Sequence, residues 1–146
     1  MHTHAMCNTV LVIDEESFFM EPYITILTRS GYNILFCNRA AQAYTAVVEH
    51  RNEIFAVVLD IMMPPDDRYS EDTTSDGRTV GLAFLSDLRQ FLPEVPVIIL
   101  TNVETHESLS SKGIVEGPIL RLVQKIACGP IDLEMLLRGL TSSQAL

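Results

Sequence analysis

Three apolar segments of the sequence end abruptly on residues whose side chains carry oxygen atoms. The run from Phe55 to Leu59 leads to Asp60, the run Thr9 to Ile13 leads to Asp14 and Glu15, and the run Val95 to Leu100 leads to Thr101. Short continuous apolar runs of this kind are typical of buried strands in a parallel sheet. Because open α/β sheets bind ligands at the carboxyl edge of their strands, we expect these side chains to form one small polar site.

The acidic residues of this site favour a metal and a phosphoryl group. Asp14, Glu15 and Asp60 would repel one another at one sheet edge, which raises their proton affinity. A hard divalent cation such as Mg²⁺, or Mn²⁺ in its place, removes that penalty and is held by carboxylate oxygens and water. Such a site suits phosphoryl transfer, in which the metal neutralises the transferring group and a carboxylate serves as nucleophile.

Thr101 and Lys125 would add donors to the same edge. The Thr101 hydroxyl follows the apolar run Val95 to Leu100, and the Lys125 ammonium follows a further apolar run at 118–123. Both groups could hold phosphoryl oxygens. Taken singly, Asp14, Glu15 or Thr101 could simply cap a helix and Lys125 could be a surface lysine. Their shared position at strand ends favours the site.

The elements that must position these residues alternate between strand and helix. We predict strands at 9–13, 33–37, 55–59, 95–100 and 118–123. Helices are predicted at 17–30, with a kink or late start at Pro22, at 40–50 and 80–91, in a short stretch within 102–117, and from Asp132 as N-cap to residue 140. This alternation predicts a doubly wound five-stranded parallel sheet of flavodoxin-like order 2-1-3-4-5, with helices on both faces.

A long acidic loop at 64–80 interrupts the pattern beside the proposed site. It has no apolar periodicity. Loops of this length in compact domains are usually functional or disordered, so a solvated insertion and a lid or partner-contact loop both stay open.

Composition narrows the class of protein. The chain has 146 residues, 47% of them hydrophobic, which predicts a single well-buried domain. No apolar run approaches the roughly 20 residues that span a bilayer. The net charge of −9 argues against nucleic-acid binding. Three cysteines without framework spacing and no secretion signal predict free thiols in the cytoplasm.

These motifs resemble the receiver domain of response regulators in two-component phosphorelay signalling. The resemblance rests on Val-Leu-Val-Ile-Asp14-Glu15-Glu, Asp60-Ile-Met-Met-Pro64, Ile-Ile-Leu-Thr101 and Lys125. It implies a receiver domain at 9–140, with an N-terminal extension at 1–8 and a tail at 141–146. It also implies that Asp60 accepts the phosphoryl group, that Thr101 is the switch hydroxyl and that Lys125 contacts the phosphate. Asp14, Glu15, Asp60 and the backbone carbonyl of Met62 would bind Mg²⁺.

The sequence departs from the family pattern at four places. The acidic loop separates Pro64 from Gly81, Asn102 follows the switch threonine where a small residue is usual, Leu122 replaces the usual aromatic residue, and Ile126 follows the lysine where proline is usual. We therefore predict that phosphoryl transfer is intact and that the structural response to phosphorylation is altered.

Three functions are open at this point. The first is a stand-alone, non-enzymatic receiver that takes a phosphoryl group from a sensor histidine kinase or phosphotransfer protein and signals to a downstream protein. The second is a pseudo-receiver, an interaction module that is not phosphorylated. The third is a Mg²⁺-dependent hydrolase with an aspartate nucleophile, although that class usually has a second Asp where this chain has Met62.

Overall fold

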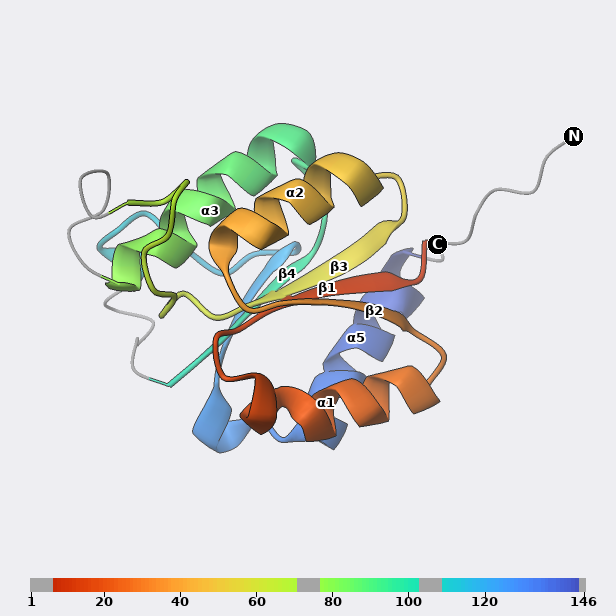
Figure 1. Cartoon of the computed structure of the whole chain (residues 1–146). Coiled ribbons are helices and arrows are strands. Elements are labelled where there is room, and N and C mark those ends of the chain that lie inside the picture. The colour runs from red at the N-terminus through yellow and green to blue at the C-terminus, as the bar shows by residue number, and fades with distance from the viewer. Residues whose placement is uncertain (1–6, 71–76, 103–108, 145–146) are drawn as a thin grey trace, which may run out of the picture.

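A computed structural model describes residues 7–70, 77–102 and 109–144. Five parallel strands form one sheet in the order β2-β1-β3-β4-β5, as predicted (Figure 1). The strands are β1 Thr9–Ile13, β2 Asn33–Cys37, β3 Ile54–Leu59, β4 Val97–Thr101 and β5 Leu120–Gln124. Strands β1, β3 and β4 are buried along their whole length, which is why they read as continuous apolar runs.

Helices cover both faces of the sheet, which confirms the predicted layers (Figure 1). Helices α2 Ala40–His50 and α3 Gly77–Phe91 lie on one face, and α1 Ser17–Arg29 and α5 Pro130–Gln144 lie on the other. Because side chains alternate along a strand, β1 sends Leu11 and Ile13 into the core beneath α2 and α3. Val10 and Val12 pack into the second core, beneath α1 and α5.

Several helix ends differ from the sequence prediction. Helix α1 begins at Ser17 and continues through Pro22, so the late start considered for it is wrong. Helix α3 begins at Gly77, three residues earlier than predicted. Part of the stretch 102–117, predicted to contain a short helix, lies outside the described residues, namely 103–108. In the described part, residues 109–110 are helical, and Gly113 has a φ of 85°.

Asp132 is not the N-cap of α5. The helix already begins at Pro130, where a missing backbone donor costs nothing. Asp132 is the third residue of the helix, and its carboxylate accepts the amide of Gly129 at 2.9 Å. The acidic side chain thus caps the helix from inside the first turn, in the manner of a capping box.

Helix α3 lies against the backbone of Ile61, the residue that follows Asp60. A Cβ added to Gly81 would lie 2.3 Å from the Cα of Ile61 and 2.8 Å from its carbonyl carbon. Only a glycine permits this approach of two backbones. The helix therefore packs directly on the residue that follows Asp60.

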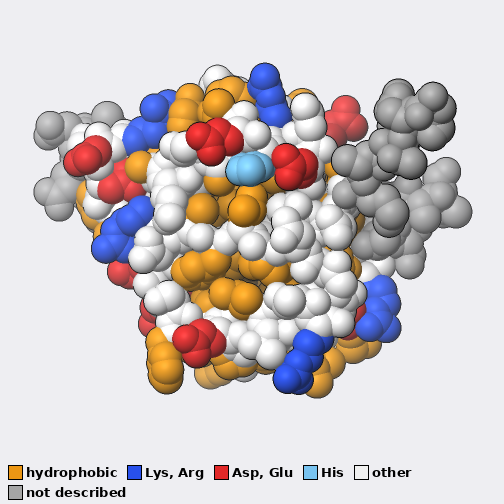
Figure 2. All heavy atoms as spheres, turned by 45° about the vertical axis from the view of Figure 1, so that its right-hand side comes forward, with side chains coloured by type: hydrophobic (Ala, Val, Ile, Leu, Met, Phe, Trp, Pro, Cys, Tyr) orange, Lys and Arg blue, Asp and Glu red, His pale blue; other side chains and the backbone are white. Residues whose placement is uncertain are grey.

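The molecular surface away from the site carries scattered charge. On the face shown in Figure 2, Lys and Arg side chains lie apart from one another and alternate with acidic groups. This face therefore carries no continuous basic patch among the described residues. No helix in the described part of the chain is both long and apolar enough to cross a membrane.

Candidate functional site

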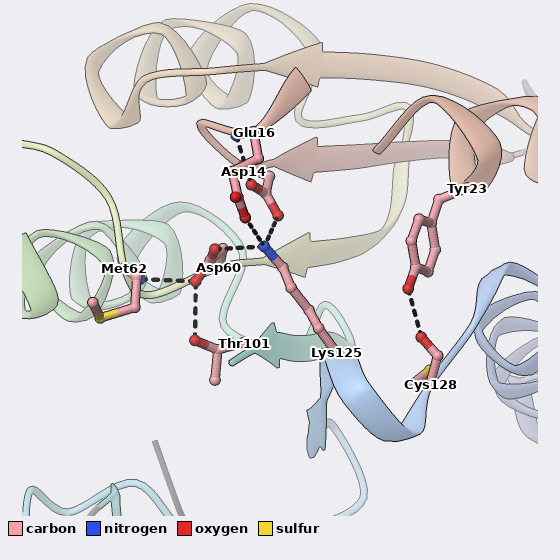
Figure 3. Close-up of polar contacts among 8 residues, drawn as sticks. All are labelled: Asp14, Glu16, Tyr23, Asp60, Met62, Thr101, Lys125 and Cys128. Carbon is pink, nitrogen blue, oxygen red and sulfur yellow. Dashed lines mark hydrogen bonds and ion pairs between the residues drawn. The ribbon is translucent and has the colours of Figure 1, made fainter. Parts of the chain in front are cut away.

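Four of the residues predicted from the sequence meet at the carboxyl edge of the sheet (Figure 3). Asp14 follows β1, Asp60 follows β3, Thr101 is the last residue of β4, and Lys125 follows β5. All four are buried, with exposed fractions between 1% and 5%. The strand order places β1, β3, β4 and β5 next to one another, so four neighbouring strand ends deliver these side chains to one point.

The Lys125 ammonium lies at the centre of the site. Its Nζ is 2.7 Å from Asp14 Oδ2, 3.0 Å from Asp60 Oδ2 and 3.0 Å from Glu16 Oε1 (Figure 3). The ring of Phe19, with its centroid 5.1 Å from Nζ, packs beside the same ammonium. One cation thus compensates three carboxylates, which leaves the cluster with an excess of negative charge when all three are ionised.

The second carboxylate oxygen of Asp60 receives two donors. Oδ1 accepts the hydroxyl of Thr101 at 3.0 Å and the backbone amide of Met62 at 2.9 Å. Each Asp60 oxygen therefore already faces groups that can hold phosphoryl oxygens: a hydroxyl and an amide on one side, an ammonium on the other. The amide of Met62 makes this contact, and the predicted metal-binding role of its carbonyl stays a prediction.

The structure places Glu16, and not Glu15, in the acidic cluster. Oxygen atoms of Asp14, Glu16 and Asp60 lie within 4.8 Å of one another, whereas Glu15 is exposed and outside this group. The reason is a local turn, because Asp14 Oδ1 accepts the amide of Glu16 at 2.8 Å. This turn brings the side chain two positions after Asp14 back over the site. Aspartate is common in turns, so a turn after Asp14 could be expected from the sequence. The sequence does not show, however, whether that turn directs Glu15 or Glu16 toward the site.

The pKa values of two groups in the cluster, Asp14 and Lys125, are shifted from their ordinary values. Desolvation raises the pKa of Asp14 to about 6, although its contacts with Lys125 and the Glu16 amide oppose the shift. Burial also lowers the pKa of the Lys125 ammonium, but its hydrogen bond to Asp14 and the nearby charges of Asp60 and Glu16 outweigh this. The net pKa of Lys125 is above its ordinary value, so the lysine is charged at neutral pH.

We predict a pH-dependent stability that originates at Asp14. Its pKa is 3.8 in an unfolded chain and about 6 in the fold, so the folded state binds its proton more tightly. Its contribution to stability is therefore fully present below about pH 4 and is lost as pH rises through about 6, a change of at most about 3 kcal/mol. The free energy of unfolding, measured with urea in EDTA, should fall less steeply with pH over this window in Asp14→Asn than in the wild type. Equal pH slopes in the two proteins would contradict this assignment.

The segment after Lys125 is fixed to α1 by a contact that the sequence prediction missed. The hydroxyl of Tyr23 donates to the carbonyl of Cys128 at 2.6 Å, in a buried position (Figure 3). This bond holds the 3-10 helix η1 Lys125–Ala127 against the first helix. A tyrosine on the apolar face of a predicted helix looks like an ordinary core residue, so no sequence signal indicated this role.

The departures from the usual pattern have different structural settings. Leu122 is buried in the core beneath α2 and α3 and is 7% exposed. Asn102 is exposed, and Ile126 is 88% exposed directly after Lys125. Leu122 is thus a packing residue and offers no ring that could move in response to Thr101.

Fold and site together define an α/β protein with a buried aspartate set among two carboxylates, a hydroxyl and an ammonium. The sequence profile described as "Response regulator receiver domain" matches residues 10–125. The match spans most of the 146 residues, and the chain belongs to this family. Among curated protein sequences, none matches the chain significantly.

Solved structures agree with the fold. A receiver domain from Clostridium thermocellum is 21% identical with a TM-score of 0.70, over 94% of this chain and 96% of that one. The signal receiver domain of an HD domain-containing protein from Pseudomonas fluorescens Pf-5 is 22% identical with a TM-score of 0.70, at the same coverage of 94% and 96%. A CheX-CheY-BeF3-Mg²⁺ complex from Borrelia burgdorferi matches at 22% identity and a TM-score of 0.59, over 79% of this chain and 77% of that one.

Proposed function

We propose that this protein accepts a phosphoryl group on Asp60. An Asp60 oxygen attacks the phosphorus of a phosphohistidine and forms an acyl phosphate while the P–N bond breaks. The released ring nitrogen takes up a proton from water, so the donor histidine leaves as neutral imidazole. One observation carries the proposal: the Asp60 carboxylate is buried, and donors already face both of its oxygens. Thr101, the Met62 amide and Lys125 would hold the phosphoryl oxygens, whose charge they oppose.

The donor set fits a hard divalent cation. Carboxylate oxygens of Asp14, Glu16 and Asp60 lie within 4.8 Å of one another, and oxygen ligands of this kind suit Mg²⁺ or Mn²⁺. Asp14, Asp60 and the carbonyl of Met62 would hold the ion, together with a carboxylate from Glu15 or Glu16. Bound there, the ion would neutralise charge on the transferring group.

Paired substitutions separate the two glutamates. Because Glu16 lies beside Asp14 and Asp60 and Glu15 is exposed outside the cluster, Glu16→Gln should weaken Mg²⁺ binding about tenfold. Glu15→Gln, the matched control with the same change of charge one position away, should have little effect. Mg²⁺ titration followed by thermal unfolding measures both. A larger loss of Mg²⁺ affinity in Glu15→Gln than in Glu16→Gln would show that Glu15 is the ligand.

Two exposed apolar side chains lie close to site residues in the sequence and suit a protein donor. Phe18 is 84% exposed two residues after Glu16, and Ile126 is 88% exposed directly after Lys125. We infer that the donor is a sensor histidine kinase or a phosphotransfer protein that covers these side chains, and that a downstream protein reads the result. The three free cysteines fit a cytoplasmic setting. The protein would act as a signalling module, with autodephosphorylation at most.

Phosphoramidate, a small donor with a P–N bond like that of phosphohistidine, tests the proposal. In the presence of Mg²⁺ the intact mass should rise by one phosphoryl group, and EDTA should abolish the gain. No gain in Mg²⁺ would contradict the proposal and favour an interaction module of the same fold that is not phosphorylated.

A further inference from the structure

The first part of the acidic loop is fixed to two helices. Residues 64–70 leave the site after Met63 and contact both α2 and α3 through three side chains: Asp66, Arg68 and Tyr69. The sequence left a solvated insertion and a functional loop as alternatives. For the described residues 64–70, these contacts exclude a purely solvated segment.

Asp66 caps helix α2 from outside that helix. Its Oδ2 accepts the amide of Ala41, in the first turn of α2, at 2.9 Å. Arg39, the N-cap residue of α2 itself, makes no side-chain capping bond. A carboxylate suits this position, because it satisfies an otherwise unpaired amide and faces the positive end of the helix dipole. Asp66 Oδ1 also accepts the amides of Arg68 and Tyr69, at 3.1 Å and 2.9 Å, which closes a tight turn.

Tyr69 and Arg68 attach the same turn to the helices. The Tyr69 side chain is buried, and its hydroxyl donates to Asp87 on α3 at 2.6 Å. Burial and this bond raise the pKa of Tyr69 above its ordinary value, so it stays a donor. The Arg68 guanidinium lies 3.3 Å above the ring of Tyr44 on α2. The turn thus bridges the two helices.

A short and stiff path joins this turn to Asp60. The amide of Met62 donates to Asp60 Oδ1, and Met63 is fully buried. Pro64 and Pro65 follow, and their rings fix the backbone angle φ at two successive positions. Asp66 comes next. Because few backbone angles can change along this path, a displacement of the Met62 amide would also displace Asp66.

We propose that residues 62–69 form a strap that transmits the state of the Asp60 carboxylate to the first turn of α2. A phosphoryl group on Asp60 changes the acceptor of the Met62 amide, shifts the strap and alters the Asp66 cap. The face formed by α2 and α3 then responds to phosphorylation. Leu122, where the family usually has an aromatic residue, is buried in the core and offers no ring that could move in response to Thr101, so the strap would be a separate connection to the site. This inference rests on the proposed function for its phosphorylation step.

Amide hydrogen exchange, read by NMR at single residues, tests the strap. In the unmodified protein, Asp66→Ala should make the Ala41 amide exchange about tenfold faster, because the bond to Asp66 is lost. Asp67→Ala, which removes the neighbouring exposed carboxylate, is the matched control and should leave Ala41 unchanged. Unaltered exchange of Ala41 in Asp66→Ala would overturn the inference.

Beryllofluoride with Mg²⁺, an analogue of the phosphoryl group, tests the transmission. It should change the exchange rate of Ala41 severalfold in the wild type and not in Asp66→Ala. A response at Thr101 without one at Ala41 would overturn the strap while supporting the proposed function.

If beryllofluoride does not bind at all, the proposed function fails, and Asp60→Ala decides the inference, because it removes the acceptor of the Met62 amide directly. Faster exchange at Ala41 in that variant supports the strap, and unchanged exchange refutes it.

Discussion

Replacing Gly81 with alanine should lower the free energy of unfolding by about 3 kcal/mol, because core overpacking typically costs 1–3 kcal/mol and a backbone clash lies at the upper end. The new Cβ would lie 2.3 Å from the Cα of Ile61, so α3 or the segment after Asp60 must move. Helix propensity favours alanine by about 1 kcal/mol and offsets only part of this cost. Because Ile61 follows Asp60, phosphoryl labelling should fall as well. Urea unfolding measures the stability change.

Gly139 provides the matched control. It lies inside helix α5, and a Cβ there would meet nothing within 4 Å. Gly139→Ala should therefore raise the free energy of unfolding by up to about 1 kcal/mol. If both variants were equally stable, the close approach of α3 to Ile61 would be refuted.

Replacing Lys125 with alanine should destabilise the metal-free protein by about 3 kcal/mol, since removal of one partner from a buried ion pair leaves uncompensated charge. Three carboxylates lose the single ammonium that lies 2.7–3.0 Å from them. Lys112→Ala, which changes an exposed lysine, is the control and should alter stability little. Urea unfolding in EDTA measures this loss.

The same variant should bind Mg²⁺ more tightly. The ammonium and a divalent cation compete for the same carboxylate oxygens, so removal of the ammonium should lower the Kd for Mg²⁺ at least tenfold. A titration followed by thermal unfolding should therefore show a larger Mg²⁺-induced rise in Tm for Lys125→Ala than for the wild type. An unchanged or weaker response to Mg²⁺ would mean that the ammonium does not occupy the cation position.

The sequence predicted the sheet and most of the site because both depend on strongly patterned segments. Strands β1, β3 and β4 are buried along their whole length, and the side chain that marks the sheet edge either ends the strand, as Thr101 does, or directly follows it, as Asp14 and Asp60 do. Those strand ends determine the positions of Asp14, Asp60 and Thr101. Lys125 could be placed in the same way, although β5 is only partly buried.

Side-chain geometry in the turns could not be predicted in this way. The choice between Glu15 and Glu16 depends on a turn formed by Asp14 and the Glu16 amide, and neighbouring glutamates look alike in a sequence. The capping role of Asp66 joins residues 25 positions apart, so no local pattern contains it. Pro130 and Asp132 both signal a helix start, and only their packing shows which of them lies inside the first turn.

The position of the phosphoryl group on the chain decides whether Asp60 is the acceptor. After treatment with acetyl phosphate and Mg²⁺, the wild type should gain one phosphoryl mass, mapped to the peptide that contains Asp60. Asp60→Asn keeps the size of the side chain but lacks the nucleophile, so it should gain none while it stays folded. Retention of the gain in Asp60→Asn, or its mapping to a serine, threonine or histidine, would show that Asp60 is not the acceptor.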